Sequence, residues 1–191
     1  MVYTNLSISL DGFIAGARVG MDNPMGDGGE RLHEWMFSGK SPDEIQAFQD
    51  EEFATTGALI MGRTMFDVGV GPWGENPPFH APVFVVTHRA AAPIVKEGGT
   101  TYTFVTDGPS AALELARAAA GDQDICVAGG AAAVRHYSNG GVIDELRLHL
   151  VPILLGDGVR LEALNRHAAQ LELQPGVKAE GNIVHLRYRL G

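Results

Sequence analysis

Short apolar runs that alternate with helical segments most constrain what this chain can fold into. The runs 58–61, 83–87 and 125–128 are almost entirely apolar, which is typical of strands buried on both faces of a parallel sheet. Residues 102–105 predict a further strand of this kind. Helical segments are expected at 65–66, 109–120 and 131–137. Strands that alternate with helices predict an α/β sheet covered by helices on both faces.

The two ends of the chain add different elements. Residues 2–8 alternate and predict a first strand, and the glycine-rich stretch 9–30 predicts a long ordered loop of the kind that borders a site. Beyond about residue 140 only strand patterns remain, at 145–155, 168–174 and 183–190. Turn residues between the last two runs predict antiparallel pairing. The expected fold is a three-layer α/β/α sandwich in one domain over residues 1–191, with a mostly parallel central sheet and antiparallel edge strands at the C-terminal end.

Two helices are expected between the first loop and the first buried strand. Ser41 precedes Pro42, and Glu44 follows three residues after the serine, which is the pattern of a capping box with proline at the first helical position. This helix is predicted to run to about Thr55. A shorter helix is predicted from Arg31 to Phe37.

Charge and composition exclude several classes of protein. Lys and Arg number 14 against 23 Asp and Glu, a net charge of −9, which argues against a general nucleic-acid binder and against docking on anionic lipid. One cysteine excludes an intrachain disulfide framework. No apolar run approaches the roughly 20 residues that span a bilayer, so a soluble, cytoplasmic protein is expected. The histidines show neither i, i+4 pairs nor a C-x-x-C partner, so no metal site is expected.

Three strand ends carry residues that suit a phosphorylated ligand. They are Gly62-Arg63-Thr64, Thr87-His88-Arg89 and Ala128-Gly129-Gly130-Ala131. Glycine lets backbone approach a phosphate, a helix start offers N–H groups, and arginine adds a planar donor fork. Each segment taken alone also fits an ordinary turn or polar strand cap. Because ligands bind beyond the carboxyl ends of strands in open α/β sheets, the three together predict one dinucleotide.

An additional phosphate on that dinucleotide would explain the arginines. Arg63 and Arg89 predict a clamp for a 2′-phosphate, since arginine commonly matches that group. The predicted cofactor is therefore NADPH rather than NADH.

Candidates for substrate chemistry lie in the loops. Asp11 is the best titratable candidate for delivering a proton, and an Asx turn with Gly12 is the alternative interpretation. Trp35 and Trp73 are candidates for stacking a heterocyclic substrate, or else plugs beneath long loops.

Six blocks in order then resemble the dihydrofolate reductase-like superfamily, in the branch that holds the reductase domain of the bifunctional riboflavin-biosynthesis protein. They are Ser9-Leu10-Asp11-Gly12-Phe13-Ile14-Ala15, Met61-Gly62-Arg63, Pro82-Val83-Phe84-Val85-Val86-Thr87, Val127-Ala128-Gly129-Gly130-Ala131, Ile143-Asp144-Glu145-Leu146 and Pro152-Ile153-Leu154-Leu155-Gly156-Asp157-Gly158. The resemblance covers most of residues 1–161.

The resemblance implies an NADPH-dependent reductase of a small heterocycle. The implied substrate is pyrimidine- or pterin-like, as for 5-amino-6-(5-phosphoribosylamino)uracil reductase, and a homodimer is common in the family. The resemblance places the three strand-end segments around the cofactor and Ala15 beside the nicotinamide. Two departures stand out: many relatives read Gly-Arg-x-Thr where this chain has Met65 at the last position, and many carry glutamate at Ala128. An NADP(H)-binding protein without catalytic turnover is the alternative.

Overall fold

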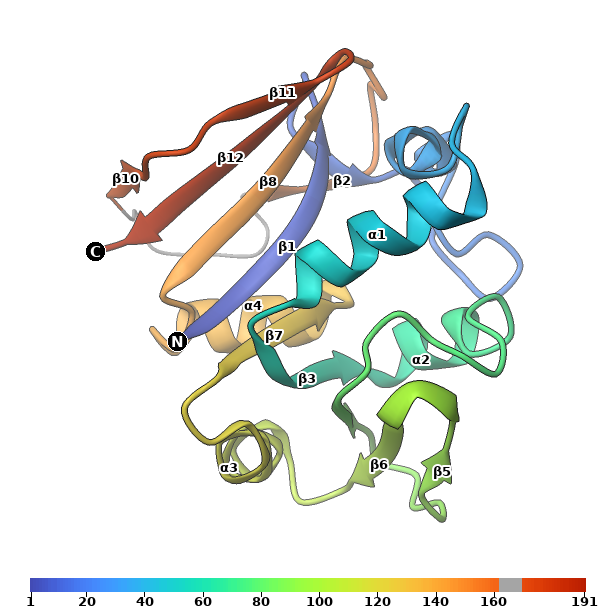
Figure 1. The fold of residues 1–191 in the computed structure, drawn as a ribbon, viewed down its shortest axis with the longest axis vertical. Helices are drawn as coiled ribbons and strands as arrows, with labels where there is room; N and C mark the ends of the chain where they lie inside the picture. The colour runs from blue at the N-terminus through green and yellow to red at the C-terminus, as the bar shows by residue number, and fades with distance from the viewer. Residues whose placement is uncertain (162–169) are drawn as a thin grey trace.

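One twisted sheet organises the molecule. The computed structural model describes residues 1–161 and 170–191. Its main sheet has ten strands in the order β10-β12-β8-β1-β7-β3-β4-β6-β5, with β11 beside β12 (Figure 1). The strands are β1 (Val2–Ser9), β3 (Thr56–Gly62), β4 (Pro82–Val86), β5 (Ile94–Val95), β6 (Thr101–Val105), β7 (Asp124–Gly129), β8 (Glu145–Val151), β10 (Leu171–Leu173), β11 (Lys178–Glu180) and β12 (Ile183–Leu190). A second, two-stranded sheet pairs β2 (Phe13–Ala15) with β9 (Val159–Arg160).

Strand direction confirms the expected fold class. Strands β8, β1, β7, β3, β4 and β6 are mutually parallel. Strands β12, β10 and β11 pair antiparallel at one end of the sheet, and β5 does so at the other. The six parallel strands therefore share one carboxyl edge.

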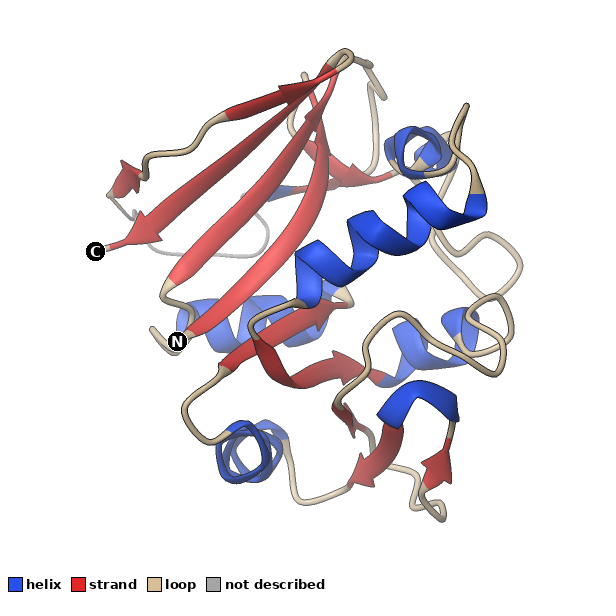
Figure 2. Ribbon diagram, in the orientation of Figure 1, coloured by secondary structure: helices blue, strands red, loops and turns tan. Residues whose placement is uncertain are grey.

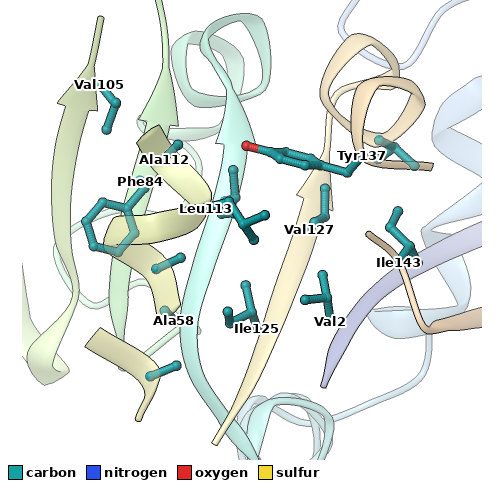
Figure 3. Close-up of a cluster of buried hydrophobic side chains, with 14 residues drawn as sticks. Val2, Ala58, Phe84, Val105, Ala112, Leu113, Ile125, Val127, Tyr137 and Ile143 are labelled. Atoms are coloured by element: carbon teal, nitrogen blue, oxygen red, sulfur yellow. The ribbon is translucent and has the colours of Figure 1, made fainter. Parts of the chain in front are cut away.

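Helices cover both faces of this sheet (Figure 2). They are α1 (Pro42–Phe53), α2 (Arg63–Gly69), α3 (Pro109–Ala120) and α4 (Ala131–Asn139), with short 3-10 helices η1 (Gly29–Leu32), η2 (Glu34–Met36) and η3 (Glu97–Gly99). Leu113 of α3 and Tyr137 of α4 pack with Phe84 and Val127 in one apolar cluster (Figure 3). Phe66 of α2 and Phe53 of α1 pack in a second apolar cluster. This cluster lies on the opposite face of the sheet, against the alternate side chains of the same strands. None of the described helices is long and apolar enough to cross a membrane.

The capping box predicts the start of α1 correctly. The Ser41 side chain accepts a hydrogen bond from the Glu44 backbone, and the Glu44 carboxylate accepts one from the Ser41 backbone. Helix α1 nevertheless contains no fully buried residue. Its inner side faces the end of the sheet where β1, β8 and β12 lie (Figure 1). Ser7, Arg147 and His149 of these strands are buried polar residues.

Several predicted boundaries are wrong. The strand expected over 145–155 ends at Val151, because the chain then turns and its backbone N–H groups at Leu155 and Gly156 are bound by a carboxylate instead of a neighbouring strand. The helix expected over 31–37 is two 3-10 turns. In the run 168–174, residues 168 and 169 lie outside the described part, and the remainder contains β10. The short strands β2, β5, β9 and β11 were not expected, since two or three residues carry no readable alternation.

Candidate functional site

Three strand ends lie side by side at the carboxyl edge of the sheet. Strand β3 lies between β7 and β4, and the register pairs Met61 with Gly129 and Gly62 with Val86. The segments that follow Gly62, Val86 and Gly129 therefore begin at adjacent positions. This is the edge at which open α/β sheets bind ligands.

The turns that follow β3 and β7 lie close together. A Cβ atom at Gly62 would lie 3.8 Å from the backbone nitrogen of Gly130. Gly129 has φ +140°, a conformation that favours glycine. A Cβ atom at Gly130 would meet no atom within 4 Å, so the backbone is open on that side. Gly130 is also the N-cap of α4, and among the described residues no side chain caps this helix start. Such a start offers backbone N–H donors to an anion.

Met65 stands at the position where the resemblance leads to an expected threonine. A Cβ atom at Gly129 would lie 2.9 Å from Met65 Sδ, so the thioether packs against the double-glycine turn. Thr64, the residue predicted to bind phosphate, is exposed one position earlier on α2. Ala128 and Ala131 flank the double glycine and are half-buried.

The two predicted clamp arginines meet on a single carboxylate. Arg63 donates from Nε to Asp67 Oδ1 at 2.6 Å, and Arg89 donates from Nη2 to Asp67 Oδ2 at 2.9 Å. The Arg63 guanidinium also lies over the rings of Phe66 and Phe104, 5.6 Å and 5.4 Å from their centroids. Arg63 and Arg89 come from different strand ends, and Asp67 holds them together.

The segment after β4 is anchored through Thr87. The Thr87 backbone N–H donates to the Val105 carbonyl, and its buried side-chain oxygen accepts a hydrogen bond from the Arg89 backbone at 3.0 Å. His88 is exposed between them. This turn directs the Arg89 side chain toward α2.

Asp11 binds a turn instead of pointing to open space. Its carboxylate accepts hydrogen bonds from Ser9 Oγ at 2.5 Å, from the Leu155 backbone at 3.1 Å and from the Gly156 backbone at 2.7 Å. These bonds, led by the one from Ser9, lower the pKa of Asp11 to about 2. At neutral pH the carboxyl group is therefore ionised and has no proton to donate.

The loop after Asp11 packs closely against the start of β9. Ala15 lies in β2 opposite Val159, and a Cβ atom at Gly158 would collide with the Ala15 carbonyl oxygen. Gly158 has φ +140°, so both space and backbone conformation require glycine there. This packing fixes the position of Ala15, which the resemblance places beside the nicotinamide.

Trp35 covers a polar layer between α1 and the sheet. Its Nε1 donates to the Leu32 carbonyl at 2.9 Å and lies 3.4 Å from Ser7 Oγ. Its ring centroid lies 5.0 Å from that of His149 and 5.3 Å from that of His185. Phe48 of α1 packs edge-on against it at 5.3 Å. Trp35 is therefore half-buried beside imidazoles and a hydroxyl.

A group of polar side chains from three strands and α1 forms what we call the polar face. They are Asn5, Ser7, Arg147, His149, His185 and Glu52. Register places Ser7 opposite His149 and His149 opposite His185. The Asn5 Oδ1 and His185 Nε2 atoms are buried without a hydrogen-bond partner in the described part of the chain. Because an unpaired buried polar atom is costly, a polar group that reached these two atoms would remove that cost.

The histidine pair shares one proton position. His149 Nδ1 and His185 Nδ1 lie 2.6 Å apart, so only one of these two atoms carries a hydrogen. Glu52 Oε2 lies 3.8 Å from His149 Nε2, which favours hydrogen on that nitrogen and makes His185 the donor between the rings. Burial, with a smaller effect from His185, lowers the pKa of His149 to about 3. The contact with Glu52 therefore involves a neutral imidazole at pH 7.

Acid should destabilise the fold through these buried histidines. Burial also lowers the pKa of His33 and of His185, so the unfolded chain binds more protons than the folded one below pH 6.5. His149 alone then reduces the free energy of unfolding by about 2 kcal/mol at pH 5, at 1.36 kcal/mol for each pH unit below 6.5. Glu52, whose pKa burial raises, acts in the opposite sense. Urea unfolding at pH 7.5, 6.5, 5.5 and 5.0 measures the trend.

Two variants separate the buried pair from histidines in general. His149→Gln should flatten the decline in unfolding free energy between pH 6.5 and 5. His88→Gln removes an exposed histidine and should leave the decline unchanged. An unaltered slope in His149→Gln would contradict the assignment.

Trp73, the other predicted stacking residue, lies beside β6, near the end of the sheet formed by β5. Its ring packs edge-on against Phe79 at 4.9 Å and parallel to Tyr102 at 6.4 Å. A Cβ atom at Gly69 would collide with the same ring. Trp73 is thus packed between α2 and β6, whereas Trp35 faces β8 and β12.

Sequence reasoning missed Asp67 and the polar face. The run 145–155 was interpreted only as an alternating strand, and no role was inferred for Arg147 and His149 within it. The available signal was the composition of residues 42–55, in which Ile45, Phe48 and Phe53 are the only large apolar residues. Within the described residues no cluster of three or more His, Cys, Asp or Glu is arranged to hold a metal ion.

Comparison with known proteins adds a family match and several similar structures. A family model described as the RibD C-terminal domain matches residues 1–176. The fold resembles a putative riboflavin biosynthesis protein from Shewanella sp. PV-4, with a TM-score of 0.68 and 20% identity over 100% of this chain and 98% of that one. It also resembles a pyrimidine reductase-like protein from Corynebacterium diphtheriae, with a TM-score of 0.57 and 13% identity over 99% and 91% of the two chains.

A longer bifunctional protein shares the same fold. The Thermotoga maritima diaminohydroxyphosphoribosylaminopyrimidine deaminase/5-amino-6-(5-phosphoribosylamino)uracil reductase matches with a TM-score of 0.61 and 12% identity, over 100% of this chain and 56% of that one. This chain therefore spans little more than half of that protein. No curated protein matches the sequence. At these identities the solved structures establish a common fold.

Proposed function

Because the chain belongs to the RibD C-terminal domain family, we propose that it is an NADPH-dependent reductase of a small pyrimidine- or pterin-like heterocycle. The named activity nearest to this proposal is the 5-amino-6-(5-phosphoribosylamino)uracil reductase of the Thermotoga relative. The observation that carries the proposal is the meeting of the Gly62 and Gly129-Gly130 turns with the Arg63–Asp67–Arg89 cluster at one edge of the sheet.

The residues at this edge fit the cofactor. Gly129, Gly130 and Ala131 present open backbone and a helix start, which suit a pyrophosphate. Arg63 and Arg89, from neighbouring turns, suit a 2′-phosphate, with Gly62, Thr87 and His88 beside them. Ala15 is assigned to the nicotinamide end. When bound, the nicotinamide supplies a hydride to the substrate.

The polar face is assigned to the substrate. Trp35 offers an aromatic surface for a flat heterocycle, and Ser7 and the His149–His185 pair offer donors and acceptors for its polar edge. The geometry assigns Asp11 to binding the 155–156 turn, so its part in the proposal is to position the glycine-rich loop.

Two measurements on the same protein test the function. Fluorescence titration should show NADPH binding more tightly than NADH, and absorbance at 340 nm should fall when a pyrimidine substrate of the riboflavin type is added to protein and NADPH. As a control, Arg117→Ala removes an arginine on α3, at the opposite face of the sheet, and should leave the affinities for both nucleotides unchanged. Failure of both nucleotides to bind overturns the proposal. Binding without oxidation across pyrimidines and pterins would instead identify a nucleotide-binding protein without turnover.

The family also supports a homodimer that works in the cytoplasm on a small molecule. Multi-angle light scattering measures the first of these. A monomer at micromolar concentration would remove the dimer from the proposal and leave the nucleotide site intact.

A further inference from the structure

Asp67 occupies the space between the two arginines that are assigned to the 2′-phosphate. We propose that Asp67 sets the preference between nucleotides with and without a 2′-phosphate, by binding in advance the guanidinium groups that would hold that phosphate. The inference rests on the proposed nucleotide site and concerns which nucleotide the site favours. It assigns Asp67 a role in specificity, with no part in hydride transfer.

Each oxygen of the Asp67 carboxylate accepts a hydrogen bond from a different arginine. Oδ1 lies 2.6 Å from Arg63 Nε, and Oδ2 lies 2.9 Å from Arg89 Nη2. The Asp67 side chain is 20% exposed, whereas that of Arg89 is 68% exposed. A largely exposed arginine loses side-chain entropy when it is held in one position. Asp67 is the contact that orients Arg89 toward Arg63.

A carboxylate and a phosphate compete for the same kind of donor. Both present paired oxygens to the planar guanidinium fork. The contacts with Asp67 use one of the five N–H donors of each arginine, so a phosphate can approach the others. The phosphate then meets a cluster of net charge +1, because the charges of two arginines and one aspartate sum to that value. Its own charge is also repelled by the carboxylate.

For a ribose without the 2′-phosphate, the effect of Asp67 on binding has the opposite sign. Its 2′-hydroxyl is a donor, and an acidic side chain near this position commonly accepts a hydrogen bond from it. Asp67 therefore favours the hydroxyl and disfavours the phosphate. The arginines keep the site selective for NADPH, and Asp67 makes that selectivity smaller than two arginines alone would give.

The test uses 2′,5′-ADP and 5′-AMP, which differ in the 2′-phosphate. Calorimetric titration of the wild-type protein, Asp67→Asn and Asp67→Ser gives the ratio of their affinities without any turnover. We expect the ratio to rise about tenfold in both variants at low salt, through tighter 2′,5′-ADP binding, and less at 0.5 M salt because exposed charges are screened. Asp107→Asn removes one exposed carboxylate after the neighbouring strand β6 and should change the ratio less than twofold.

The outcomes distinguish this inference from the function it rests on. An unchanged ratio in both Asp67 variants, or 2′,5′-ADP binding weakened as by loss of an arginine, overturns the inference and leaves the nucleotide site standing. If Asp107→Asn raises the ratio equally, the effect is general charge and the inference is again wrong. If the wild-type protein binds neither 2′,5′-ADP nor NADPH, the proposed function fails. Thermal unfolding of each variant confirms that it is folded.

Discussion

Arg63→Ala should weaken NADPH binding by about 1.5–3 kcal/mol, which is roughly a 10- to 150-fold rise in Kd. The Arg63 guanidinium lies over the rings of Phe66 and Phe104, which restrict its motion, so little entropy remains to be lost when it binds a phosphate. A hydrogen bond between charged groups in this setting falls at the strong end of the usual range. Fluorescence titration with NADPH measures the change.

The comparison with NADH tests whether Arg63 binds the 2′-phosphate. If Arg63 binds the 2′-phosphate, NADH affinity should change by less than twofold. Arg63→Lys keeps the charge and loses the planar fork, so it should recover only part of the loss. Arg117→Ala should change neither affinity. Equal losses for NADPH and NADH would show that Arg63 acts elsewhere on the nucleotide.

Arg147→Ala should destabilise the fold by about 3–5 kcal/mol. The Arg147 side chain is 7% exposed and donates from Nε to Glu145 Oε1 at 2.7 Å. Its guanidinium carbon lies 3.6 Å from the centroid of the Tyr3 ring, a close cation–π contact. Alanine removes both contacts and leaves the Glu145 carboxylate, whose side chain is only 12% exposed, without its partner. Urea unfolding at pH 7.5 measures the loss.

Two further variants isolate the cause of that loss. Arg187→Ala removes an exposed arginine directly opposite Arg147 on β12 and should cost less than about 0.5 kcal/mol. The double variant Arg147→Met with Glu145→Gln removes the charge imbalance and should recover most of the stability. A loss below 1 kcal/mol in Arg147→Ala would mean that water already satisfies Glu145.

The strands of the parallel core could be predicted because their apolar composition by itself indicates that they are buried. The run Ala58–Met61 contains only apolar side chains, and a strand of that kind has to be buried on both faces. The capping box at Ser41 and Glu44 is likewise local, since its donors and acceptors lie within four residues. The shared edge at Gly62, Thr87 and Gly129 follows as well, because parallel strands end on one side of a sheet. The family match over residues 1–176 agrees with this architecture.

Contacts between distant segments could not be predicted in the same way. Asp67 and Arg89 are 22 residues apart and meet only because β3 and β4 are neighbours. From the sequence, Asp11 is a candidate proton donor or a local turn residue, yet in the structure its carboxylate accepts hydrogen bonds from the distant Leu155 and Gly156 backbones. A single aspartate in a sequence carries no sign of which distant donor it will meet.

What the amino-acid order alone determined, then, is the set of buried strands, the helices between them and the side of the sheet on which glycines and arginines accumulate. Only the tertiary structure decided that α1 lies over polar side chains, that His149 and His185 come within 2.6 Å, and that a carboxylate joins Arg63 to Arg89. The physical reason is that hydrophobic burial and turn chemistry depend on neighbours along the chain. The pairing of buried polar and charged groups depends on strand order, which is fixed only when the whole sheet assembles.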